Sequence, residues 1–177
     1  MSPEQLAFLE DEFFSMTLMA TVQHGRLYRK GSSEAERNAF RRRLRSELPR
    51  LAEQYGAGVS EGQHLANIKN LANGLSGEHV NVLEGGRFRI GSAQKALNLY
   101  LKYMWCLGRI PAPPHCPFDS MVLSRLDGCR NVRWTQLDSL SEYERIVFHA
   151  KDAAGTIPLP EWELHLYNAA QPVAPAG

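Results

Sequence analysis

The apolar residues of this chain recur every three or four positions, a spacing typical of helices, and no segment shows the alternation of a strand. The first run covers residues 6–27 and follows a Ser-Pro pair that is typical of a helix start. Further helices are expected over 33–51, 60–75, 92–107, 117–126, 139–153 and 160–167. The pattern predicts an all-α fold, with one compact multi-helix domain over residues 1–170 and a flexible, Pro- and Ala-rich tail over 171–177.

The helix predicted over residues 92–107 is apolar nearly all round, which is typical of a helix at the centre of a domain. Its polar residues are confined to one strip, formed by Gln94, Lys95, Asn98 and Lys102. A lysine in such a strip either extends to the rim of the domain or lines a cleft. In a cleft, desolvation lowers the pKa of the amine and makes it a nucleophile at neutral pH. Lys95 is the first candidate for this role and Lys102 the second.

A Pro-rich segment over residues 111–117 leads from this helix to Asp119, which lies at the start of the next one. A carboxylate at this position commonly caps the helix and interacts favourably with its dipole. Because Lys95 and Asp119 both lie near helix starts, the chain can also bring them face to face. Capping and catalysis are therefore both open for Asp119.

Gly91 and Ser92 lie at the start of the central helix and allow both a structural and a functional interpretation. They can be a turn residue and an N-cap, as at any helix. Alternatively, the glycine turn exposes backbone N–H groups that bind a phosphate, with Arg87 and Arg89 beside them.

Composition narrows the possible functions only a little. The 177 residues are 44% apolar and 22% charged, and their net charge of +1 gives no global argument for nucleic-acid binding. Six arginines crowd the segment 37–50, where they form either a local anion-binding patch or a solvated helix face. The three cysteines match no zinc-finger spacing, so we expect no metal and no cofactor. We also expect a cytoplasmic protein, and one without membrane segments. The oligomeric state is not predicted.

The segment from about Leu83 to Leu126 resembles the helix-hairpin-helix DNA glycosylase superfamily. Members have a glycine turn, a helix that begins with a catalytic lysine, and a Pro-containing return to an aspartate at the next helix start. The stretch Gln94-Lys95-Ala96-Leu97-Asn98-Leu99-Tyr100-Leu101-Lys102-Tyr103-Met104 is closest to the archaeal 8-oxoguanine glycosylase branch, and residues 115–122 resemble its Val-Pro-x-Asp segment. The usual Pro-Gly-x-Gly hairpin is replaced by residues 87–91, and the lysine follows the glycine by four positions instead of two.

The resemblance implies a DNA-repair enzyme, a hydrolase or lyase, that excises an oxidised purine from double-stranded DNA. Lys95 would attack the deoxyribose, with Lys102 as the alternative nucleophile, and Asp119 would assist the proton transfer. The DNA-binding residues would be Arg87, Arg89, Gly91, Ser92, Gln94, Asn98 and Lys102. Two other interpretations stay open: a helical nucleic-acid-binding protein without chemistry, and an adaptor that binds another protein.

Overall fold

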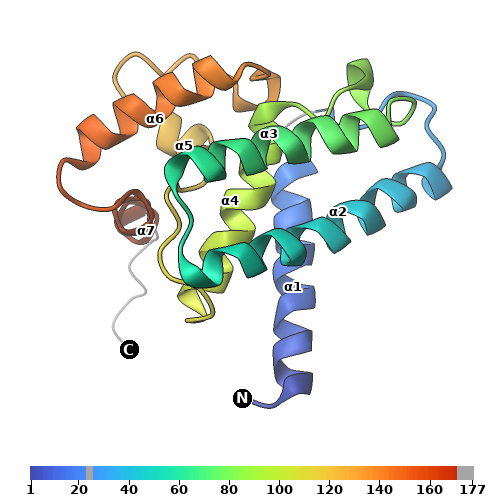
Figure 1. Cartoon of the computed structure of the whole chain (residues 1–177). Helices are drawn as coiled ribbons and strands as arrows, with labels where there is room; N and C mark the ends of the chain where they lie inside the picture. The colour runs from blue at the N-terminus through green and yellow to red at the C-terminus, as the bar shows by residue number, and fades with distance from the viewer. Residues whose placement is uncertain (23–25, 171–177) are drawn as a thin grey trace, which may run out of the picture.

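The computed structural model describes residues 1–22 and 26–170, and it confirms the all-α prediction (Figure 1). In the described residues the only strand-like pairing is an isolated bridge between Tyr28 and Leu83. The α-helices are α1 (Pro3–Val22), α2 (Glu34–Gln54), α3 (Glu61–Glu78), α4 (Ile90–Cys106), α5 (Ser120–Leu123), α6 (Leu140–Ala154) and α7 (Leu159–Ala170). Three short 3-10 helices are η1 (Tyr55–Ala57), η2 (Glu84–Gly86) and η3 (Trp134–Gln136). The predicted tail over residues 171–177 lies outside the described residues.

Helix α4 is the central helix, as its all-round apolarity predicts. It packs against α1, α2, α3 and α6 and against η3, and every residue from Ile90 to Leu101 is buried (Figure 1). Trp105 is only half-buried, because it lies in the last turn of α4, where the helix leaves the core. The central position of α4 places its polar strip inside the molecule.

Two helix boundaries near the candidate site differ from the sequence prediction. Helix α4 begins at Ile90, with Arg89 at the N-cap position, so Ser92 lies inside the first turn and does not cap the helix. Helix α5 covers only Ser120–Leu123, because residues 117–119 are not helical and residues 124–126 form turns and a bend. The start of α5 agrees with the capping role of Asp119, whose side chain accepts hydrogen bonds from the backbone N–H groups of Met121 and Val122.

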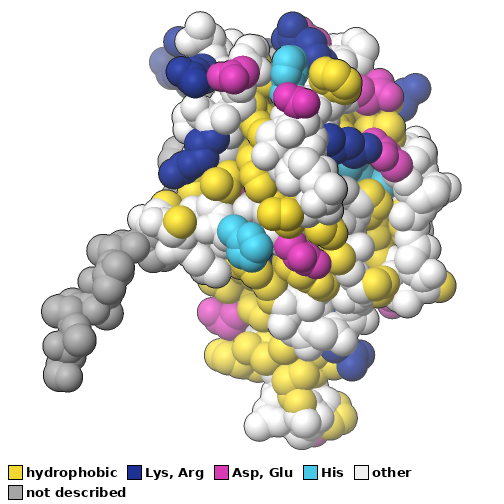
Figure 2. Space-filling view, turned by 90° about the vertical axis from the view of Figure 1, so that its left-hand side faces the viewer, with side chains coloured by type: hydrophobic (Ala, Val, Ile, Leu, Met, Phe, Trp, Pro, Cys, Tyr) yellow, Lys and Arg dark blue, Asp and Glu magenta, His cyan; other side chains and the backbone are white. Residues whose placement is uncertain are grey.

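The N-terminal part of α1 projects from the rest of the molecule (Figure 1). Apolar side chains gather on this projection, as Figure 2 shows, and Met1 and Phe8 are 67% and 63% exposed. Among the described residues, no helix combines the length and the apolar character that crossing a membrane requires.

Candidate functional site

Lys95 and Asp119 meet, as their positions at two neighbouring helix starts predict. The Lys95 Nζ atom lies 2.7 Å from Oδ2 of Asp119, and the other carboxylate oxygen of Asp119 caps α5. The side chain of Lys95 is 8% exposed and that of Asp119 is 26% exposed. The pair is therefore accessible mainly from the side of the carboxylate.

The electrostatic environment of Asp119 favours the ionised carboxylate. Partial burial by itself raises the pKa of this group, but the charge and hydrogen bond of Lys95 and the two backbone N–H donors outweigh burial. The pKa of Asp119 consequently lies below its ordinary value. In this state Lys95 and Asp119 form an ammonium–carboxylate pair.

The rest of the polar strip on α4 holds the segment that carries Asp119. Gln94 donates to the carbonyl of Phe118 at 2.8 Å and accepts the Phe118 N–H at 3.1 Å. Asn98 donates to the carbonyl of Cys116 at 2.9 Å. Gln94 and Asn98 are fully buried, so the Gln94 amide and the Asn98 side-chain N–H groups bind the backbone of this return segment and do not face solvent. We therefore do not retain them among the candidates for direct DNA contact.

Lys102 belongs to a separate ion pair further along α4. Its Nζ atom lies 2.7 Å from a carboxylate oxygen of Glu163, which is 4% exposed in α7, and also lies over the ring of Tyr167. Burial raises the pKa of Glu163, although the hydrogen bond from Lys102 opposes this. The structure thus gives each of the two candidate lysines its own carboxylate, and only Lys95 is paired with Asp119.

The N-terminus of α4 is occupied by a loop of the same chain. The Gly91 N–H donates to the carbonyl of Leu137 at 2.8 Å, and the Ile90 N–H donates to the carboxylate of Asp138 at 3.3 Å. Arg87 forms two hydrogen bonds with the same carboxylate, at 2.9 and 3.1 Å. Asp138 thus takes the position that a phosphate was expected to take, and the N–H of Gly91 is already in use.

A cavity of about 800 Å³ lies beside this blocked helix end and next to α5. Its walls include Arg89 and Ser120. Arg87, the other arginine predicted beside Gly91, does not line it, and Ser120 directly follows Asp119. Arg26 and Arg133 also line it, and sequence reasoning missed both because they lie in two loops that are far apart in the sequence. Ser92 is buried and lines a smaller neighbouring cavity with Arg87 and Arg89. Neither Lys95 nor Asp119 lines the larger cavity, and Ser120 is the residue that connects it with the pair.

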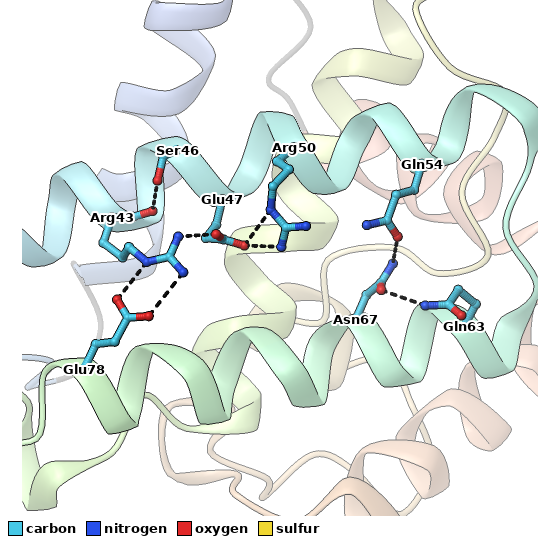
Figure 3. Close-up of polar contacts among 8 residues, drawn as sticks. All are labelled: Arg43, Ser46, Glu47, Arg50, Gln54, Gln63, Asn67 and Glu78. Carbon is cyan, nitrogen blue, oxygen red and sulfur yellow. Dashed lines mark hydrogen bonds and ion pairs between the residues drawn. The ribbon is translucent and has the colours of Figure 1, made fainter.

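The arginine-rich segment of α2 is engaged in ion pairs within the protein. Figure 3 shows Arg43 between Glu47 of its own helix and Glu78 of α3, and Arg50 beside Glu47. Arg41 and Arg45 also bind carboxylates, those of Glu34 and Asp11. These contacts favour the reading of this segment as a solvated helix face.

A buried polar cluster connects α3 with the return segment. His115 contacts the hydroxyl of Tyr143 at 2.9 Å, and its ring lies 4.6 Å from that of His64. Burial lowers the pKa of His115 to about 4, although Glu61 opposes this, and lowers that of His64 well below its ordinary value. Both histidines are thus held neutral in the core. Within the described part of the chain, no group of three or more His, Cys, Asp or Glu side chains could hold a metal ion.

Comparisons of this chain with protein families, with curated proteins and with solved structures found no match.

Proposed function

We propose that this protein is a DNA glycosylase with lyase activity that excises a damaged purine, of the oxidised type, through Lys95. The observation that carries the proposal is the 2.7 Å contact between Lys95 Nζ and Asp119 Oδ2 beside an arginine-lined cavity. An amine nucleophile needs a neighbouring group that accepts its proton, and Asp119 is within reach to do so.

The proposed reaction begins when the target nucleotide leaves the base stack and its deoxyribose reaches the pair. The Lys95 ammonium gives a proton to Asp119, and the neutral amine attacks C1′ while the bond from C1′ to the base breaks. The base leaves with the proton that Asp119 accepted, which makes Asp119 a carboxylate again. Opening of the sugar ring moves a proton from the attached nitrogen to O4′ and gives a protonated Schiff base between Lys95 and C1′. The restored carboxylate of Asp119 stabilises this positive charge. Lys102 lies in its own pair with Glu163 and has no part in this reaction.

The test is base release from DNA duplexes that contain 8-oxoguanine or another oxidised purine. Lys95→Gln should abolish release, whereas Asp119→Asn should slow it by roughly 10²–10⁴-fold, because proton transfer and charge stabilisation are weakened. Lys102→Gln is the matched control and should retain release. Thermal unfolding of each variant separates a chemical defect from a folding defect. Release that survives in folded Lys95→Gln would refute the proposed nucleophile.

A second candidate function is nucleic-acid binding without chemistry. It is favoured by the small exposed fraction of Lys95, 8%, and by the engagement of its ammonium with Asp119. Under this alternative the pair only fixes the return segment to α4. Wild-type protein that binds duplex DNA but releases no base from the panel would support it.

A further inference from the structure

A second cavity adjoins the arginine-lined one at the loop that precedes α6. It has a volume of about 370 Å³, shares Val132, Arg133 and Gln136 with the first cavity and extends to Arg145 of α6. We call the combined lining of the two cavities the arginine groove. Its cationic residues are Arg26, Arg89, Arg133 and Arg145, and its acidic residues are Glu84 and Glu142.

Among the described residues, Arg89, Arg133 and Arg145 lie within ion-pair distance of no carboxylate, whereas Arg43 and Arg87 each bind one or more. Some arginines outside the groove, such as Arg109, also lack a carboxylate partner within the described part of the chain, so the groove is marked by the gathering of such arginines on one concave surface. Arg89 is half-buried, whereas Arg133 and Arg145 are exposed. Guanidinium groups without a carboxylate partner can form charge-assisted hydrogen bonds with an added anion.

The N-terminus of α4, which is the alternative site for such an anion, is blocked. Its first N–H groups donate to Leu137 and Asp138, and the carbonyl of Trp134 lies directly against Gly91. A phosphate therefore cannot approach the helix N-terminus without displacing this loop. Trp134, Thr135 and Gln136 of the same loop line the groove, which therefore offers an anion a site beside the blocked helix end.

We propose that the arginine groove binds the phosphodiester backbone of DNA next to the nucleotide that reaches Lys95 and Asp119. Guanidinium groups bind phosphate oxygens in a bidentate manner, and several arginines along one groove match a run of phosphates. Ser120 lines the groove and directly follows Asp119, so a strand bound there passes the reacting pair. The placement relative to the pair rests on the proposed function, whereas the binding of the backbone does not.

The test is the affinity for a fluorescein-labelled DNA duplex of about 20 base pairs, measured by anisotropy between about 50 and 200 mM NaCl. Arg133→Gln and Arg89→Gln should each weaken binding, and each should reduce the slope of log Kd against log salt by about 1. The control is Arg130→Gln. Arg130 is an exposed arginine of the same loop, and it pairs with Asp127. It should leave both affinity and slope close to those of the wild type. Arg133 is exposed, so its variant reports on binding even if Arg89→Gln impairs folding.

Several outcomes would overturn the proposal. Equal losses in Arg130→Gln and Arg133→Gln would mean that only net charge matters. Tighter, groove-dependent binding of an RNA duplex of the same sequence would overturn the assignment to DNA. Unchanged affinity in both groove variants, together with base release that depends on Lys95, would refute the groove and leave the glycosylase proposal standing. Loss of binding in the groove variants, with no base release by the wild type, would support the groove and refute the glycosylase proposal.

Discussion

The backbone of Gly91 lies so close to Trp134 that a Cβ atom at position 91 would stand 1.6 Å from the Trp134 carbonyl oxygen. Only a glycine allows the loop before α6 to pack against the start of α4. The hydrogen bond from the Gly91 N–H to Leu137, at 2.8 Å, fixes the same contact. Because of this packing, the helix start that resembles a phosphate site is covered by the loop. The same loop forms one wall of the arginine groove.

Gly91→Ala should therefore destabilise the protein by at least about 2 kcal/mol, because either the loop or the helix must move. The measurement is the free energy of unfolding in urea. Gly74→Ala is the matched control, since Gly74 lies inside α3 and a Cβ atom there meets nothing within 4 Å. Alanine at position 74 should stabilise the helix by about 0.4–1 kcal/mol. Similar effects of the two substitutions would contradict the close packing at Gly91.

The two hydrogen bonds between Gln94 and Phe118 should stabilise the return segment that carries Asp119. Gln94→Ala leaves a buried N–H and a buried carbonyl of Phe118 without partners, at a cost of about 2–4 kcal/mol. Urea unfolding measures the loss, and Gln136→Ala, which removes an exposed glutamine, is the control with little expected change. A loss no larger than that of Gln136→Ala would mean that the return segment is held by other contacts.

The buried histidines should make the protein less stable in acid. Burial keeps His115 neutral in the folded state, with a pKa of about 4, while in the unfolded chain it takes up a proton near pH 6.5. The unfolded state thus binds more protons below pH 6.5, and stability falls as the pH decreases toward about 4. Between about pH 7.5 and 4.5 the loss from His115 alone should be about 2–3 kcal/mol, measured by urea unfolding.

Two substitutions separate this effect from general acid sensitivity. His115→Gln should reduce the pH dependence over that range, whatever its effect on stability at neutral pH, because the titrating group is removed. His165→Gln removes an exposed histidine of α7 and should leave the dependence unchanged. Parallel pH profiles for the wild type and His115→Gln would contradict the assignment.

The central helix and the Lys95–Asp119 contact could be predicted because both depend on local patterns. All-round apolarity places α4 in the core, and two neighbouring helix starts joined by a proline-rich return bring the lysine and the aspartate together. The partners of Gln94 and Asn98 could not be predicted in this way. A polar strip looks the same in sequence whether it faces solvent or the carbonyls of another segment.

The blocked start of α4 and the arginine groove depend on contacts between distant parts of the chain. Asp138 reaches Arg87 across 51 positions, and no local pattern links the two residues. Arg26, Arg89 and Arg133 come from three separate loops, so the cationic surface exists only in the folded protein. The dense arginines of α2 are the stronger signal in sequence, but four of the six are paired with carboxylates within the protein.

The proposed function depends most on which lysine reacts. Incubation of the wild-type protein with a duplex that carries an oxidised purine, followed by borohydride reduction, should trap a covalent protein–DNA adduct, because a Schiff base is reducible and a simple complex is not. Proteolysis and mass spectrometry of the adduct should then locate the modified sugar on Lys95, the lysine that contacts Asp119 at 2.7 Å. An adduct on Lys102, or no adduct with any oxidised purine tested, would contradict the role that we assign to the Lys95–Asp119 pair.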